Sequence, residues 1–213
     1  MRRLLIGGLL VVAACGTIGS PLITSTDVYE FRDLELGDTT VFHWKRTDLP
    51  VRVWVASDSP IRQYVETAIS RWENAFLYGE FSATMVTDST KADVIVRNSP
   101  PDVGGGIHAF APECTGETDP DIDPVTKTAT LPMHVYVYPA TSLPGAGLAT
   151  CYSITVTHEF GHVLGIINSN HAGTNSGDVM FGNPVFDGIS NRDRLTANTL
   201  YLVAPNVTIT GRR

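Results

Sequence analysis

The most constraining feature of the sequence is a pair of histidines in an apolar stretch. His158 and His162 are four residues apart within residues 154–180, and Glu159 follows the first of them. Side chains four residues apart lie on one face of an α-helix, so both imidazoles can reach the same ion. Imidazole is a common zinc ligand, and a carboxylate beside it can act as a general base. The pattern predicts a zinc-binding helix.

A glycine marks the expected end of this helix. Gly165 follows His162 by three residues. Because glycine adopts left-handed backbone conformations without steric cost, the helix can stop there and the chain can turn back toward the metal. The loop after Gly165 is therefore expected to supply a third ligand.

The eight residues from His158 to Gly165 resemble the start of the metzincin metalloprotease motif HExxHxxGxxH, and the matrixin branch most closely. Asn168 stands where the motif has its third histidine, and the next histidine is His171. Met180 follows His171 by nine residues and Asn168 by twelve, and the shorter interval is closer to that of matrixins. Neutral amides are also poor zinc ligands. We therefore expect His171 to be the third ligand, with Asn168 as the alternative.

The resemblance extends from about Val41 to Val203 by the order of expected elements, and it implies an α+β fold. This metzincin-like domain would contain a twisted, mostly parallel sheet with an antiparallel edge strand, a packing helix, the HExxH active-site helix and a C-terminal helix. It also implies that Met180, in a methionine-containing turn, forms the hydrophobic floor below the metal. Residues 181–186 would form a wall of the specificity pocket.

The sequence IHAFAP at residues 107–112 resembles the matrixin edge strand along the substrate cleft. An extended peptide would pair with this rim, which comprises Gly106, Ile107, His108 and Ala109. Matrixins also hold a structural zinc on histidines of this strand and the next, which would correspond to His108 and His134. The other ligands of that family site are not visible here, so ordinary strand histidines are the alternative.

Residues 113–124 are expected to form a polar, acidic loop. Asp119, Asp121 and Asp123 alternate as in the opening of a calcium-binding loop, but the glycine and glutamate of an EF-hand do not follow. A solvated acidic loop is therefore the first interpretation. Calcium binding is the alternative, because matrixins bind this ion.

Local patterns predict the other elements. Alternating valines indicate a strand at 51–55, and Ser153 is a candidate cap for the metal-binding helix. Ser190 and Asp193 form a capping signal for a last helix that ends near Val203. Further strands are expected at 81–86, 93–97 and 130–138, and Pro132 indicates that the last of them either lies at an edge of the sheet or begins at Met133. A helix beginning at Pro60 should bury Ile61, Val65, Ala68, Ile69, Trp72 and Phe76.

The N-terminus has the features of an export signal. Residues 1–14 combine two arginines with an apolar run too short to span a bilayer. Residues 12–15 resemble a bacterial lipobox, which implies lipidation of Cys15; ordinary signal-peptide cleavage is the alternative. We expect a flexible tether at 15–40 and one catalytic domain at 41–213. The protein would be exported and held at the cell membrane or outer membrane by its lipid alone.

Cysteine number and charge add two expectations. Lipidation of Cys15 leaves Cys114 and Cys151, which are expected to form a disulfide in an oxidising compartment, with two free thiols as the alternative. The formal net charge of −7 disfavours binding to nucleic acid. A monomer is expected.

These features together predict a zinc endopeptidase that cleaves extended protein substrates with Glu159 as the general base. The displaced third histidine motivates one alternative, a surface lipoprotein that retains the fold as a binding module without turnover. A cell-wall amide hydrolase is another.

Overall fold

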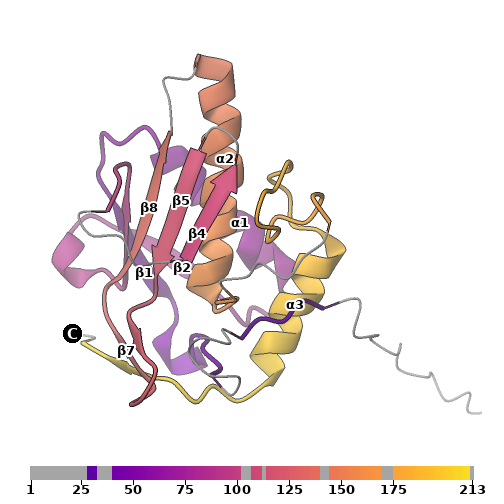
Figure 1. Ribbon diagram of the computed structural model, residues 1–213. Coiled ribbons are helices and arrows are strands. Elements are labelled where there is room, and N and C mark those ends of the chain that lie inside the picture. Colours follow the sequence, from indigo (N-terminus) through magenta and orange to yellow (C-terminus); the bar gives the residue numbers. More distant parts are fainter. Residues whose placement is uncertain are drawn as a thin grey trace, which may run out of the picture.

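A computed structural model of the chain describes residues 28–32, 40–101, 107–111, 114–139, 144–168 and 175–211. Helices pack against a mixed sheet in an α+β arrangement, as predicted (Figure 1). The long helix α2 (Gly145–Leu164) runs beside the strands, and α3 (Asn191–Leu202) lies near its C-terminal end. Valines that alternate with polar residues form the core face of the sheet.

The main sheet has the strand order β2-β1-β3-β8-β5-β4. Its first four strands are parallel, whereas β5 runs antiparallel to both of its neighbours, β8 and β4. The bounds are β1 (Val51–Val55), β2 (Ala83–Val86), β3 (Val94–Arg97), β4 (Ile107–Ala111), β5 (Cys114–Asp119) and β8 (Met133–Pro139). A small second sheet contains β6 (Ile122–Asp123), β7 (Thr128–Thr130) and β9 (Thr208–Thr210).

Side-chain periodicity explains the helices. α1 (Arg62–Ala75) buries Val65, Ala68, Ile69 and Trp72, as its helical spacing predicted. α2 is buried around most of its circumference in its second half, as expected for a helix between a sheet and other elements. α3 begins at the predicted capping box, in which the Ser190 hydroxyl accepts from the Asp193 amide. Two short 3₁₀-helices, η1 (Arg46–Asp48) and η2 (Ser89–Lys91), complete the described elements.

The prediction of an acidic loop at residues 113–124 is wrong over most of that range. β5 and β6 lie there, and Cys114, Gly116 and Thr118 face α2. The strand was not predicted because its sequence is polar, and the residues that face the helix are small rather than apolar. Consequently β4 is the edge strand, but β5 separates it from the parallel part of the sheet.

One further boundary, the start of α2, differs from the prediction, and the start of β8 at Met133 agrees with it. α2 begins at Gly145 after Pro144, so Ser153 lies inside the helix and does not cap it. β8 lies in the interior of the sheet and begins at Met133. Pro132 therefore precedes the strand, as expected for a residue with no backbone N–H to donate to a neighbouring strand.

Part of the expected tether packs on the domain. Tyr29 is buried, and its backbone amide donates to Thr196 Oγ1 at 2.9 Å. The Ile167 amide donates to the carbonyl of Phe31 at 3.0 Å. Residues 28–32 therefore belong to the folded unit, which begins before the predicted boundary at Val41. Among the described helices none is long and apolar enough to cross a membrane, and Cys15 lies outside the described residues.

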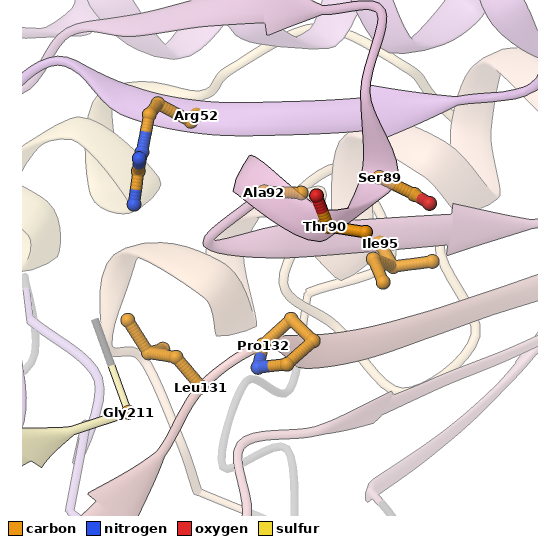
Figure 2. Close-up of a pocket in the computed structure, with 8 residues that line it drawn as sticks. All are labelled: Arg52, Ser89, Thr90, Ala92, Ile95, Leu131, Pro132 and Gly211. Carbon is orange, nitrogen blue, oxygen red and sulfur yellow. The ribbon is translucent and has the colours of Figure 1, made fainter. Parts of the chain in front are cut away.

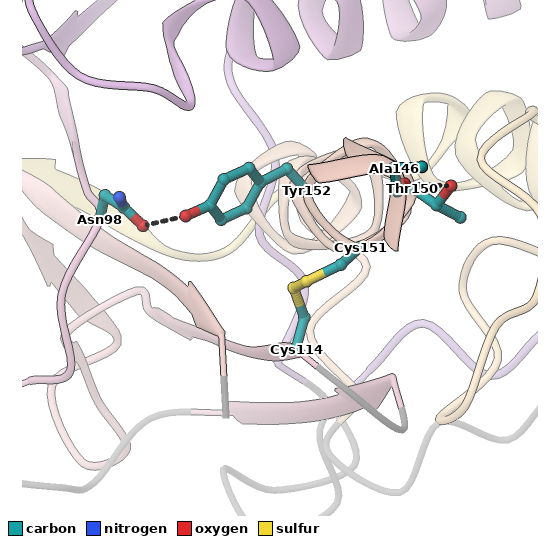
Figure 3. Close-up of a disulfide and its surroundings, with 6 residues drawn as sticks. All are labelled: Asn98, Cys114, Ala146, Thr150, Cys151 and Tyr152. Atoms are coloured by element: carbon teal, nitrogen blue, oxygen red, sulfur yellow. Dashed lines mark hydrogen bonds between the residues drawn. A yellow bond between two sulfur atoms is a disulfide. The ribbon is translucent and has the colours of Figure 1, made fainter. Parts of the chain in front are cut away.

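The predicted disulfide joins the sheet to the long helix. Cys114 on β5 and Cys151 on α2 are bonded, with a Cα–Cα distance of 5.5 Å and a sequence separation of 37 residues (Figure 3). Next to it, the Tyr152 hydroxyl donates to Asn98 Oδ1 at 3.1 Å. These bonds fix the first half of α2 against the sheet.

We predict that replacing both cysteines with alanine destabilises the protein by about 4 kcal/mol, because closing a loop of this length restricts the unfolded chain. Urea denaturation of Cys114→Ala/Cys151→Ala, compared with the oxidised wild type, measures the change. Alanine avoids placing a new polar group in a buried site. A loss below about 1 kcal/mol would contradict a stabilising role for the disulfide.

Candidate metal centre

The last two turns of α2 carry His158, Glu159 and His162, and all three side chains are buried. Their burial follows from the position of α2 between the sheet and the segments that follow the helix. The Nε2 atoms of the two histidines lie 3.1 Å apart. The spacing of four residues therefore brings both rings to one point, as predicted.

Backbone carbonyls orient both rings. His158 Nδ1 donates to the Val179 carbonyl at 2.6 Å, and His162 Nδ1 donates to the Ile166 carbonyl at 2.5 Å. Because a carbonyl oxygen only accepts hydrogen bonds, the proton of each neutral ring is on Nδ1. Each Nε2 is then an unprotonated acceptor.

Two unprotonated nitrogens cannot form a hydrogen bond with each other, and their lone pairs repel. A cation between them removes this repulsion. Tetrahedral zinc with nitrogen ligands at about 2.0–2.1 Å would separate two such nitrogens by roughly 3.3 Å. The observed pair fits two ligand positions, and Nδ1 bonds to carbonyls are typical of zinc-bound histidines.

The end of α2 positions the Ile166 carbonyl. Gly165 has a φ of +117° and ends the helix in a left-handed conformation, as predicted. A Cβ atom at Gly165 would lie only 2.0 Å from the Phe42 carbonyl oxygen, so this close approach also requires glycine. The turn brings Ile166 back to accept from His162.

The Val179 carbonyl is positioned from α3. The Asp193 carboxylate accepts from the backbone amides of Val179 at 3.0 Å and Met180 at 3.1 Å. It also accepts from the Ser190 amide at 2.8 Å, so one buried side chain caps α3 and holds the preceding turn. Burial nevertheless raises the pKa of Asp193, against the effect of these hydrogen bonds.

Met180 lies directly against α2. Its side chain is buried, and a Cβ atom at Gly161 would lie 2.1 Å from its sulfur. His158 Nδ1 bonds to the carbonyl of Val179, the residue before Met180, so the methionine follows directly on a contact of the histidine pair.

Glu159 faces β5. Its Oε2 accepts from the Thr118 hydroxyl at 2.6 Å, and its Oε1 has no hydrogen-bond partner among the described residues. Burial raises the pKa of Glu159 well above its usual range, and the nearby Glu117 carboxylate adds to this effect; the Thr118 hydrogen bond opposes it. The carboxyl group is therefore suited to gaining a proton.

Gly116 makes room for this carboxyl group. A Cβ atom at Gly116 would lie 2.1 Å from Glu159 Oε1 and 2.6 Å from the Thr155 side chain. Sequence reasoning missed both Gly116 and Thr118, because it interpreted their strand as a loop. The signal that could have identified it is the small residue at every second position, Cys114, Gly116 and Thr118.

The third ligand is not determined by the described residues. His171 lies outside them, and within them no three histidine, cysteine or acidic side chains form a metal-binding group. Asn168 is buried, and its Nδ2 donates to the Glu30 carbonyl at 2.8 Å. The side chain of Asn168 thus helps to hold the N-terminal segment.

The two histidines considered for a second zinc are not on neighbouring strands. β5 lies between β4, which carries His108, and β8, which carries His134. In the register of the sheet, His108 is opposite Glu117, and His134 is opposite Asp119. Burial and the nearby Arg97 lower the pKa of His134. Of the predicted rim, residues 107–109 lie on β4, and Gly106 is outside the described residues.

The alternating aspartates bind backbone amides. Asp119 accepts from the Asp121 amide at 2.9 Å, and Asp123 accepts from the amides of Val125 and Thr126, both at 2.8 Å. These bonds stabilise tight turns at the ends of β5 and β6. These contacts give Asp119 and Asp123 structural roles, and calcium binding stays a prediction.

A separate cavity of about 490 Å³ lies on the other face of the main sheet (Figure 2). Arg52 and Ile95, which project there, alternate with the valines that face the helices. Arg52 is bound to Asp93 at 2.7 Å. The lining residues are Arg52, Ser89, Thr90, Ala92, Ile95, Leu131, Pro132 and Gly211, so the histidine pair does not contribute to this cavity.

Comparison with known proteins does not assign a family. No protein-family model matches the sequence, and none of the curated proteins matches it.

We predict that Gly116→Ala destabilises the protein by about 1–3 kcal/mol, because the added methyl group must displace the Glu159 carboxyl group or shift the backbone. Chemical denaturation measures the loss. Gly188→Ala is the matched control, since a Cβ atom there would meet nothing within 4 Å. Equal stability of the two variants would show that β5 and α2 are not in close contact at Gly116.

Proposed function

We propose that this protein is a zinc-dependent endopeptidase of the metzincin type, related in its site to the matrixins. The observation that carries the proposal is the convergence of the Nε2 atoms of His158 and His162, 3.1 Å apart, beside a buried glutamate. The left-handed turn at Gly165 and the packing of Met180 under α2 support the resemblance in the motif.

His158 and His162 would hold the zinc, with His171 as the proposed third ligand. Asn168 Nδ2 donates to the Glu30 carbonyl and so supports the N-terminal segment, and imidazole is the better zinc ligand of the two side chains. When bound, zinc would activate a water molecule and polarise the scissile carbonyl. The bonds of both Nδ1 atoms to carbonyls keep the ligand nitrogens directed at the ion before it binds.

Glu159 is the proposed general base. Thr118 holds its Oε2, which leaves Oε1 as the atom that takes a proton from water and returns it to the departing amine. Burial raises the pKa of the carboxyl group, which makes its carboxylate a stronger base. Thr118 would act as a positioning residue through Glu159.

An extended peptide is the proposed substrate. β4 is at the edge of the main sheet, so a substrate strand can pair with its outer edge. The proposed rim is the segment from Gly106 to Ala109. Residues 181–186, which follow Met180, would contribute the wall of a side-chain pocket. The substrate would then be recognised by main-chain bonds and by one or more side chains.

We predict that Glu159→Gln lowers kcat for peptide cleavage by about 10²–10⁴-fold while zinc content stays near one per chain, because only the base is lost. Cleavage of a peptide library and metal analysis of the purified protein measure both quantities. Glu66→Gln, at an exposed position on α1, is the control.

If the wild type and Glu159→Gln hold zinc but cleave peptides equally slowly, the endopeptidase proposal is wrong and a binding role is favoured. Cleavage of peptidoglycan fragments but not of linear peptides would instead identify a cell-wall amide hydrolase.

We also predict that His171→Ala lowers zinc affinity at least tenfold, whereas Asn168→Ala leaves it nearly unchanged, because imidazole binds zinc and the Asn168 amide contacts Glu30. Competition with a fluorescent chelator gives the affinities. His134→Ala serves as the control for a second zinc site. The opposite order for the first two variants would make Asn168 the ligand.

A further inference from the structure

The chain leaves the carboxyl ends of β1 and β3 in opposite directions. These two strands are parallel neighbours in the main sheet. After β1 the chain continues through α1 to β2 on one side, whereas after β3 it continues to β4 at the opposite edge of the sheet. In open sheets of parallel strands, such a change of direction leaves a crevice at the carboxyl ends of the strands, and small ligands bind there.

A cavity of about 360 Å³ occupies this crevice. Its volume is at the lower end of the range for small-molecule pockets, about 300–1,000 Å³. The aromatic and polar residues that line it come from both strands and from the loops that follow them: Trp54, Asp58, Ser59, Arg97, Asn98 and Ser99. The cavity does not include the described residues of the candidate metal centre.

Trp54 is the tryptophan that the core does not bury. Trp44 and Trp72 are 1% and 0% exposed, whereas Trp54 is only partly buried, on the face of β1 opposite the buried valines. The indole Nε1 of Trp54 donates to the Thr87 carbonyl at 3.3 Å, which restrains the plane of the ring. The cavity therefore contains a flat apolar surface whose orientation is held.

The polar side chains of the cavity supply both donors and an acceptor. The Tyr152 hydroxyl on α2 donates to Asn98 Oδ1 at 3.1 Å, so Asn98 Nδ2 is the group that remains to donate to a ligand (Figure 3). The side chains of Arg97 and Asp58 bring one charge of each sign, and neither is bonded to another described residue. The cavity thus combines hydrogen-bonding groups without an excess of either charge.

We propose that this cavity is a binding site for a neutral saccharide. A sugar ring has apolar C–H groups on its faces and hydroxyl groups around its edge. The indole of Trp54 packs against one face, since Trp combines a large apolar surface with access to water. Arg97 and Asn98 donate to oxygens at the edge of the ring, and the Asp58 carboxylate accepts from its hydroxyl groups.

The charges of the cavity argue against a phosphate or a nucleotide as the ligand. Recognition of a phosphate group uses arginine or lysine side chains that are not offset by a carboxylate. Here Asp58 lies in the same cavity as Arg97 and would repel an anion. A ligand with many hydroxyl groups and no net charge uses both side chains.

Titration calorimetry with neutral trisaccharides of N-acetylglucosamine, glucose, galactose and mannose tests the site. At least one of them should bind to the wild type with a dissociation constant in the millimolar range or below. Trp54→Ala should weaken this binding about tenfold and Trp54→Phe less, because phenylalanine retains a flat ring. Tyr78→Ala is the matched control, since Tyr78 is an aromatic residue outside the cavity that is 79% exposed.

A second measurement uses the accessibility of the indole ring. Because Trp44 and Trp72 are buried, iodide quenching of tryptophan fluorescence reports mainly on Trp54. The bound trisaccharide should protect the wild type from quenching. Arg97→Met, at an exposed position, should retain the fold and lose about threefold in affinity, because one charge-assisted donor is removed.

The proposal is overturned if none of the four trisaccharides binds at millimolar concentration, or if Trp54→Ala and Arg97→Met bind as tightly as the wild type. Binding of inorganic phosphate or ATP that Arg97→Met abolishes, without binding of a sugar, would show an anion site instead. Peptide cleavage is a separate readout: wild type that binds a trisaccharide but cleaves no peptide would contradict the endopeptidase proposal and leave the saccharide site in place.

Discussion

The hydrogen bonds from two imidazole Nδ1 atoms to backbone carbonyls are the contacts on which the candidate site depends. They determine which nitrogen of each ring is unprotonated, and they hold both lone pairs toward one point. A different structural feature holds each of the two accepting carbonyls in position. Gly165 reverses the chain at the end of α2, whereas Asp193 on α3 holds the turn that contains Val179. The convergence of the two rings is thus produced by helix ends as well as by the spacing of the histidines.

Short-range patterns allowed much of this structure to be predicted. The spacing of His158 and His162, the helix stop at Gly165 and the capping box at Ser190 each involve only a few residues, so their geometry follows from local backbone chemistry. Strands with alternating valines and the buried face of α1 were predictable for the same reason. The disulfide could be predicted because assigning Cys15 to lipidation left only two cysteines.

Features that depend on distant contacts were not predicted. The sequence of β5 is polar, and its strand conformation is stabilised by neighbours on both sides and by α2 above it. The contact between Thr118 and Glu159 joins residues 41 positions apart, and that between Arg71 and Asp187 spans 116. Nor does local composition show that Tyr29 is buried against α3. No periodicity in the sequence encodes such pairs.

Two glycines, Gly116 and Gly161, allow close packing around α2. Gly116 on the sheet packs against α2, and Gly161 on α2 packs against Met180. At each glycine there is space for a hydrogen atom but not for a methyl group. A roll of α2 by one residue would turn it through about 100° and move both imidazoles away from their shared point. The close packing at these two glycines is specific to the observed rotational setting of the helix. The direction of the helix face that carries His158 and His162 is therefore encoded partly by the lack of side chains at Gly116 and Gly161.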